Sequence, residues 1–149
     1  MRHFDLDRTF DSVVCLFSSI GYMTALTDLQ EAVATMARHL SPGGIVMIEG
    51  WIEPDYWLGS RVNVQTYQDG ELAVARLNRS SRDGEVSTLD MHYVATTITG
   101  VTSVDEHHVL RLSVPSEFVT AFEMANLSFE RIPHMLRAGR SVYVGKLHR

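Results

Sequence analysis

Two short apolar runs in the first third of the chain predict buried strands. The run over residues 10–17 is continuous rather than alternating and β-branched at its centre, which is typical of a strand covered on both faces. A second aliphatic run covers residues 45–48, after the chain-turning sequence SPGG at 41–44, and leads into Glu49. We interpret both runs as strands of one sheet.

Between the two runs, apolar residues recur at the spacing of an amphipathic helix. The recurring residues are Leu29, Val33, Met36 and Leu40. Thr27 and Gln30 have the spacing of a capping box, so we predict a helix from about residue 27 to residue 40. Strand, helix and strand with short joints form a βαβ unit, with a right-handed crossover and two parallel strands.

Beyond residue 60 the pattern becomes that of an antiparallel meander. Asp69-Gly70 and Asp83-Gly84 are strong hairpin signals between short β-branched stretches. Many of these stretches alternate apolar with polar residues, as a half-exposed sheet does. The clearest predicted strands are residues 72–77, 86–98 and 109–114.

A helix is predicted to open at Pro115 and to stop at Asn126, before two final strands at 127–132 and 141–147. The predicted fold class is therefore α/β. We expect three parts: a βαβ part over residues 1–59, an antiparallel insertion over 60–114, and a helix with a strand hairpin over 115–149.

Composition and charge narrow the class of protein. The 149 residues fit one domain, and 45% apolar with 21% charged residues excludes disorder. The net charge is -5 without a long basic run, so we expect no nucleic-acid partner. The apolar stretches are far shorter than the about 20 residues of a membrane span, and no signal segment follows Met1. We expect a cytoplasmic protein without a membrane partner.

Metal binding is not expected either. Cys15 is the only cysteine, so neither a disulfide framework nor a thiolate site can form. The seven histidines show no paired-ligand spacing. His107 and His108 are adjacent, and in a strand they would point to opposite faces.

Several motifs resemble those of a known enzyme family. They are Met1-Arg2-x-Phe4-x-Leu6, FSSIGYM at 17–23, LSPGG at 40–44, EGW at 49–51, and Gly139-Arg140 with Tyr143-Val-Gly145. With them the chain resembles the carboxyl-terminal part of a class I S-adenosylmethionine-dependent methyltransferase. LSPGG is typical of the superfamily. FSSIGYM is narrower and resembles the N,N-dimethyltransferases that act on nucleotide-linked 3-amino-deoxyhexoses in antibiotic biosynthesis.

The resemblance implies a Rossmann-like sheet of which only strands four, five, seven and six are represented. The family's glycine-rich cofactor turn has no counterpart, since the sequence contains no G-x-G, and we expect the chain to be truncated and to bind S-adenosylmethionine weakly. The strand over residues 10–17 would then be an open edge, where a homodimer or other self-association could form. The resemblance also implies that the insertion over 60–114 forms part of the acceptor pocket and of the dimer contact.

The same resemblance assigns the cofactor residues. Leu16 and Phe17, with Ser18 at the strand tip, are expected to contact the methionyl part of S-adenosylmethionine, and Met1 the adenine. Ser18 could instead only cap the turn. Tyr22 is the leading catalytic candidate, placed to orient the acceptor amine by a hydrogen bond. The alternative is a tyrosine that packs on the insertion with its hydroxyl in water.

The acceptor residues are expected at the same strand ends. Ser19 and the carboxylate of Glu49 could hold an amine, and the indole of Trp51 could pack on a sugar. Ordinary packing of Trp51 is the simpler alternative. Arg137 and Arg140 could bind the diphosphate bidentately, or lie in solvent.

Two functions remain from the sequence. The first is a methyltransferase that uses S-adenosylmethionine to methylate the amine of a nucleotide-linked amino sugar. The second is a non-catalytic module that binds a nucleotide sugar or a partner subunit. The first function places the site where the two parallel strands end.

Overall fold

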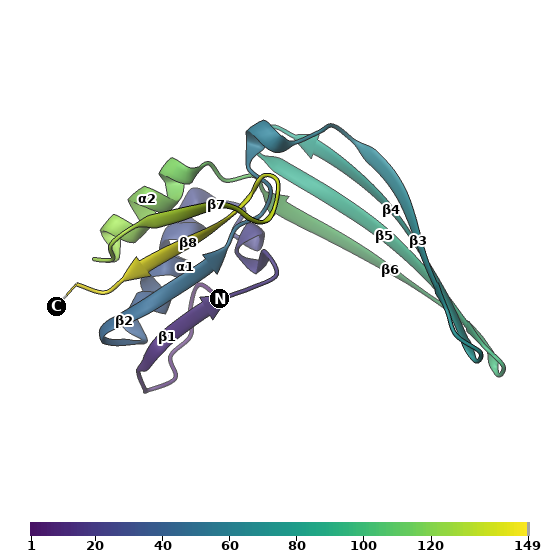
Figure 1. Ribbon diagram of the computed structural model, residues 1–149, viewed down its shortest axis with the longest axis horizontal. Coiled ribbons are helices and arrows are strands. Elements are labelled where there is room, and N and C mark those ends of the chain that lie inside the picture. The colour runs from purple at the N-terminus through teal and green to yellow at the C-terminus, as the bar shows by residue number, and fades with distance from the viewer. Residues whose placement is uncertain (149) are drawn as a thin grey trace. The chain divides into compact units, whose positions relative to one another are not determined.

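The computed structural model describes residues 1–148 and divides into two compact units. The first unit combines Met1–Trp57 with the segment from Leu110 onward, and the second is Leu58–Val109. Each unit contains one four-stranded sheet (Figure 1). No helix among the described residues has the length and apolar character that a membrane crossing requires.

The sheet of the first unit has the predicted strand order. Its strands are β1 (Phe10–Cys15), β2 (Leu40–Glu49), β8 (Arg140–Lys146) and β7 (Glu130–Arg137), in the order β1-β2-β8-β7. β1 and β2 are parallel, while β2 with β8 and β8 with β7 are antiparallel. The βαβ unit and the order four, five, seven, six are therefore confirmed, and the carboxyl ends of β1 and β2 lie at the same edge.

Two helices cover one face of this sheet. α1 (Leu26–Arg38) and α2 (Pro115–Met124) lie behind the sheet in Figure 1 and pack on each other. Between the helices and the sheet lies one apolar core. Its fully buried members include Leu29, Val33, Val46, Ile48, Phe122 and Tyr143.

The first strand is less buried than its sequence predicts. We expected residues 10–17 to be covered on both faces, but β1 ends at Cys15, and Val14 is 52% exposed. β1 is the edge strand of its sheet, and among the described residues no further strand pairs with it. The apolar pattern therefore marks a surface that this part of the chain leaves uncovered.

Two local predictions in the βαβ unit were wrong. Thr27 does not cap α1: the residue before the helix is Ala25, and it makes no side-chain cap hydrogen bond. The SPGG segment does not precede β2 but forms its irregular first half, with Gly43 at φ 79°. Gly44 is required there, because a Cβ would lie 3.1 Å from the carbonyl oxygen of Asp11 in β1.

The second unit is the predicted antiparallel meander. Its strands are β3 (Arg61–Gln68), β4 (Leu72–Asp83), β5 (Val86–Thr97) and β6 (Gly100–Arg111), in sequential order, and β6 ends in the first unit. β6 runs over residues 100–111 and not over 109–114 as predicted. The first eight residues of β6 are all exposed and mostly polar, so apolar patterning did not reveal them.

The strand predicted at 127–132 is also displaced. β7 begins at Glu130, and Leu127 makes an isolated bridge to Leu147. Asn126 adopts φ 58°, so the helix stop is as predicted but the chain needs three more residues to enter the sheet.

The core assignment predicts the effect of truncating Phe122. Phe122 is fully buried, so Phe122→Ala should lower the free energy of unfolding by about 3–5 kcal/mol. Met124 lies in the same helix but is 68% exposed, and Met124→Ala should change it by less than about 0.5 kcal/mol. Urea denaturation followed by circular dichroism measures both; equal effects would contradict the core described here.

Candidate active site

The chain makes a strained turn where β1 ends. Phe17 and Ser18 both adopt left-handed backbone conformations, with φ of 54° and 57°. Such conformations are unfavourable for residues other than glycine and persist when surrounding contacts hold them. The turn leads into a short 3-10 helix, η1 (Ser19–Tyr22).

Glu49, the last residue of β2, holds this turn. Its Oε2 atom accepts a hydrogen bond from the backbone N–H of Phe17 at 2.7 Å. The hydroxyl of Ser18 lies 3.2 Å from Oε1 of Glu49 and 2.9 Å from the carbonyl oxygen of Gly50. Ser18 is 2% exposed, so these bonds form away from water. The ends of β1 and β2 are therefore joined by a charged hydrogen-bond acceptor.

A close approach at Gly21 adds a second connection between the strand ends. A Cβ on Gly21 would lie 3.2 Å from the Cβ of Trp51 and 3.0 Å from Cδ2 of Leu110. Only glycine allows the η1 turn to pack this closely against the segment that follows β2.

Arg140 completes the cluster from β8. Its guanidinium group lies over the indole ring of Trp51, with 4.4 Å from Cζ to the ring centroid. Its Nη1 atom is 3.9 Å from Oε1 of Glu49. Burial and the nearby positive charge of Arg137 lower the pKa of Arg140, while Glu49 acts in the opposite direction. Arg140 is thus partnered by a carboxylate and an aromatic ring.

The other predicted site residues lie around this cluster or away from it. Ser19 donates from Oγ to the carbonyl oxygen of Leu16, a turn-capping bond. Met1 lies beside β1, with its Sδ 3.7 Å from Sγ of Cys15. Tyr22 ends η1 and is 47% exposed. Arg137 is exposed at the β7–β8 turn and is not drawn into the cluster by any described hydrogen bond.

The side chain of Phe17 is unusually exposed at this edge. It is 87% exposed although its backbone is fixed by Glu49, and Leu16 beside it is 43% exposed. Burial raises the pKa of the Cys15 thiol just before them to about 11, with the carboxylate of Glu49 adding to the shift. The edge is therefore apolar, with one carboxylate set behind it.

A buried network near the site had no sequence signal. Glu53 is 5% exposed and accepts hydrogen bonds from the guanidinium of Arg131, from Ser141 Oγ at 2.5 Å and from Tyr143 OH at 3.2 Å. Burial and the Glu53 charge raise the pKa of Tyr143 well above its ordinary range. The backbone N–H of Glu53 also donates to Gly139 at 2.8 Å. The segment that carries Trp51 is thereby fixed to β7 and β8.

Arg111 forms a second anchor that the sequence did not reveal. It is 8% exposed, bonds Glu117 at 2.5 Å, and donates to the carbonyl oxygen of Thr24 at 3.3 Å. Glu117 in turn accepts from the backbone N–H of Val114 at the start of α2. Arg111 thus ties the segment that follows Tyr22 to α2.

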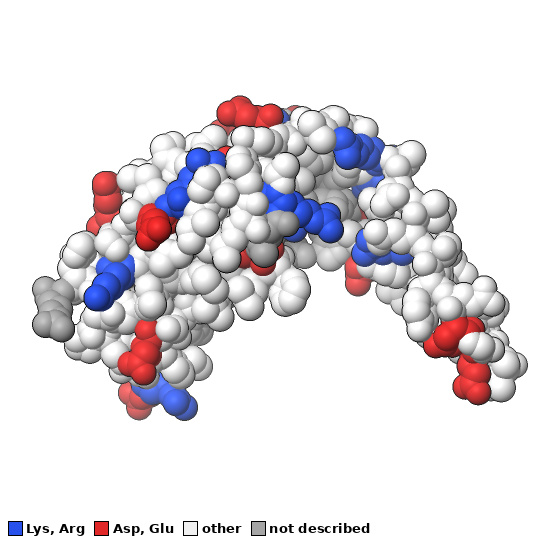
Figure 2. Space-filling view, in the orientation of Figure 1, with Lys and Arg blue, Asp and Glu red and all other residues white. Residues whose placement is uncertain are grey.

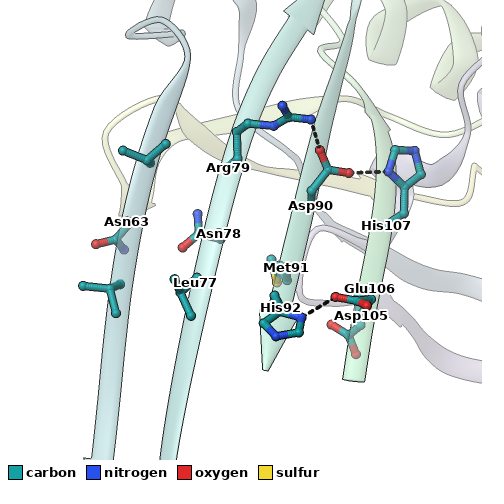
Figure 3. A pocket seen from close by; sticks show the side chains of 12 residues that line it. Asn63, Leu77, Asn78, Arg79, Asp90, Met91, His92, Asp105, Glu106 and His107 are labelled. Atoms are coloured by element: carbon teal, nitrogen blue, oxygen red, sulfur yellow. Dashed lines mark hydrogen bonds and ion pairs between the residues drawn. The ribbon is translucent and has the colours of Figure 1, made fainter. Parts of the chain in front are cut away.

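One face of the second unit carries a row of charges (Figure 3). Asp90 accepts from Arg79 at 2.8 Å and pairs with His107 at 2.6 Å, and in the next row His92 pairs with Asp105 at 2.5 Å. The hydrogen bond from Arg79, then that from His107, lowers the pKa of Asp90. A hollow of about 750 Å³ lies over these side chains, with Val62, Val64 and Leu77 as its apolar part.

The face shown in Figure 2 offers little to a polyanion. Basic side chains are scattered on the face shown in Figure 2 and form no continuous patch there. Within residues 1–148, no group of three or more histidine, cysteine, aspartate or glutamate side chains could hold a metal ion.

The geometry suits a reaction that needs alignment more than acid catalysis. The joined strand ends combine a rigid main-chain turn, exposed apolar side chains, one carboxylate and an aromatic ring. Such a set can position a cationic or amine group, and it lies at the carboxyl ends of parallel strands, where ligands bind in α/β sheets.

Known proteins with similar sequences are amino sugar methyltransferases. The chain is 36% identical over 146 residues to a dTDP-3-amino-3,6-dideoxy-alpha-D-glucopyranose N,N-dimethyltransferase from Streptomyces fradiae. It is 34% identical over 145 residues to a dTDP-4-amino-2,3,4,6-tetradeoxy-D-glucose N,N-dimethyltransferase from Saccharopolyspora spinosa. Each match covers 97% of this chain, which spans 57% and 58% of those two relatives. No protein-family model matches the chain.

Solved structures that resemble this chain are also sugar methyltransferases. A sugar N-methyltransferase from Streptoalloteichus superposes with a TM-score of 0.91 at 33% identity, covering 99% of this chain and 60% of that one. An amino pentose methyltransferase from Micromonospora echinaspora, involved in calicheamicin biosynthesis and solved with S-adenosylmethionine bound, gives 0.84 at 29% identity. That match covers 97% of this chain and 61% of the other.

The role of Glu49 predicts faster exchange of one backbone amide. A hydrogen bond to a charged group contributes roughly 1.5–3 kcal/mol, so Glu49→Ala should speed hydrogen exchange of the Phe17 amide about tenfold or more. The pKa of Cys15 should fall as well, because a nearby negative charge is lost. Hydrogen exchange measured by NMR checks the first effect, and alkylation rate against pH the second. Glu71→Ala, in an exposed turn, is the control; unchanged Phe17 exchange in Glu49→Ala would disprove the role.

Proposed function

The chain is a homologue of the nucleotide-linked amino sugar N,N-dimethyltransferases, as its motifs predicted, and on this premise we propose that it methylates the amine of a nucleotide-linked amino sugar. One observation carries the proposal. The ends of two parallel strands, fixed to each other by Glu49, form a single apolar edge within the homologous region.

The residues at this edge fit the proposed cofactor, S-adenosylmethionine. When bound, the cofactor supplies a methyl group on a positively charged sulfur, which an unprotonated amine can displace in line. The exposed side chains of Met1, Leu16 and Phe17 suit its apolar parts, and the fixed turn at Ser18 suits its polar methionyl end. These four residues are our proposed cofactor contacts.

The acceptor amine is proposed to meet Tyr22. Its half-exposed phenol ends the η1 turn and can accept or donate a hydrogen bond, which orients the nitrogen without acting as a strong base. Ser19, Glu49 and Trp51 would contact the sugar. The carboxylate of Glu49 favours a cationic amine nearby, and the indole offers an apolar face.

A diphosphate is proposed to pair with Arg137 and Arg140. Arg137 is exposed, whereas Arg140 already contacts the carboxylate of Glu49 and the ring of Trp51. Binding by Arg140 would therefore weaken its contact with Glu49 and link the acceptor to the turn at Phe17. Antibiotic biosynthesis is the proposed setting, because the similar amino pentose methyltransferase takes part in calicheamicin biosynthesis.

A methylation assay tests this function. The protein, in the full length that its gene encodes, is incubated with S-adenosylmethionine and dTDP-linked amino sugars, and mass spectrometry detects one or two added methyl groups. Tyr22→Phe should lower kcat about tenfold to a hundredfold and leave cofactor affinity unchanged, because only amine orientation is lost. Phe129→Tyr, on a partly buried core ring, is a control for general effects. Binding of the nucleotide sugar without methylation would favour the non-catalytic module instead.

Self-association is proposed through the charged face of the second unit, which is the face with Arg79, Asp90 and His107. Its alternating positive and negative groups can pair with the same row in a second copy, and Val62 and Val64 are exposed beside it. The edge of β1 is the other candidate contact.

Two matched substitutions separate these contacts. Val64 lies on the charged face, and Val104 lies on the opposite face by strand alternation, since Asp105 is on the charged face; both are more than half exposed. Val64→Asp should raise the dimer dissociation constant at least tenfold in analytical ultracentrifugation, and Val104→Asp should leave it unchanged. If Val14→Lys in β1 abolishes the dimer while Val64→Asp does not, the contact is the β1 edge. A monomer at millimolar concentration would rule out both contacts.

A further inference from the structure

The first nine residues contact one side of α1 before the chain enters β1, and we call residues 1–9 the N-terminal strap. The first part of the strap is held by Arg2. Its Nη1 atom lies 2.5 Å from Oδ1 of Asp28, and its carbonyl oxygen accepts a hydrogen bond from the hydroxyl of Thr35 at 2.5 Å. The second part is held by the ring of His39, the residue that follows α1. The two parts of the strap are therefore fixed by different chemical groups.

The imidazole of His39 is buried, and each of its nitrogen atoms has a backbone partner. His39 is 4% exposed. Its Nδ1 atom lies 2.8 Å from the carbonyl oxygen of Thr35, and its Nε2 atom lies 3.1 Å from the backbone nitrogen of Leu6. A carbonyl oxygen can only accept and a backbone N–H can only donate, so Nδ1 must carry the proton and Nε2 must offer its lone pair. These two partners assign one neutral tautomer to the ring.

Charged groups of both signs lie around the imidazole. Oδ1 of Asp5 is 3.8 Å from Nε2, and it also accepts from the backbone N–H of Asp7 at 2.9 Å. Arg8 from the strap and Arg38 from α1 line the same hollow, which has a volume of about 510 Å³. Among the described residues that line it, none is a charged residue of β1 or β2. The carboxylates attract an imidazolium, whereas the two guanidinium groups repel it.

We propose that His39 is a pH-sensitive latch for the N-terminal strap. Histidine gains a proton in the range between about pH 8 and pH 5, and a protonated Nε2 becomes a donor that cannot accept from the Leu6 N–H. Two N–H groups would then face each other across 3.1 Å, so this hydrogen bond is lost. The carboxylate of Asp5 is close enough to accept from the new Nε2–H after a small movement. The latch is therefore closed at the upper end of this pH range and open at the lower end.

Release is expected in the second part of the strap and not in the first. The contacts of Arg2 involve no histidine. The pair of His3 with Glu31 is largely exposed, where an ion pair contributes little. The backbone carbonyl of His39 accepts from the N–H of Phe10, the first residue of β1, at 2.8 Å. The latch thus lies at the entry of the strand that leads to the active-site turn, and it does not depend on the proposed enzyme activity.

An NMR titration of the wild-type protein between about pH 8 and pH 5 tests the latch. The ring nitrogen shifts of His39 should show the Nδ1–H tautomer at the upper pH and protonation at the lower pH. The protection factor of the Leu6 amide, which compares its exchange rate with the intrinsic rate at the same pH, should fall about threefold to tenfold over the same titration. The amide of Val33, buried within α1, should keep its protection.

Three substitutions separate the latch from general effects of acid. His39→Gln replaces the ring with an amide that can accept and donate but does not titrate, so Leu6 protection should become independent of pH. His39→Phe keeps a ring to stack on Phe4 but has no acceptor, so Leu6 protection should be low throughout the titration. His3→Gln removes the other histidine that contacts α1 from the strap side, and it should retain the wild-type pH dependence.

Four results would overturn the proposal. Three come from the wild-type protein, so the test does not depend on any variant folding. They are a ring that carries its proton on Nε2 at the upper pH, a ring that stays neutral at the lower pH, and Leu6 protection that stays constant while the ring gains a proton. The fourth is a loss of Leu6 protection that persists in His39→Gln, since another group would then cause it.

Discussion

The hydrogen bond between the Glu49 carboxylate and the Phe17 backbone is the interaction on which the site depends. It fixes two left-handed residues that would otherwise be unfavourable, and it joins the ends of β1 and β2. Because a carboxylate is a stronger acceptor than a neutral group, one side chain can hold both the Phe17 amide and the Ser18 hydroxyl. The exposed ring of Phe17 is then displayed on a rigid support, which suits a surface that must align a ligand.

Buried charges surround this turn and act as supports. Glu53 with Arg131 fixes the segment after β2, and Arg111 with Glu117 fixes the segment after Tyr22. Each charge is paired within the fold, so its burial is compensated. These supports come from β6, β7 and the start of α2, far along the chain from the residues that they hold. Residues from the C-terminal part of the chain therefore hold the site residues of the N-terminal part in place.

The two faces of the second unit show different kinds of polarity. On one face, Arg79, Asp90 and His107 satisfy each other, and their side chains remain 38–70% exposed. On the other, Arg76 and Asn78 keep buried atoms without partners. Paired charges at a surface suit contact with another charged surface. Alternation along β4 places these two sets of side chains on opposite faces of one strand.

Local pattern was enough to predict the βαβ unit, the meander and both helices, because apolar periodicity and turn residues act over a few positions. Short motifs were enough to predict the relatives that the comparisons found. Glu49 and Trp51 were singled out from their strand end, and Phe17 by the resemblance. Residue pairings could not be predicted in this way. Arg140 contacts Glu49, Arg131 contacts Glu53 and Arg111 contacts Thr24, each across 78 or more positions of sequence. The burial of β1 was overestimated for a related reason: the apolar residues of a strand do not show which other segment covers them. The spacing of apolar and turn residues predicts the helices and strands, but contacts between distant residues exist only once the chain has folded.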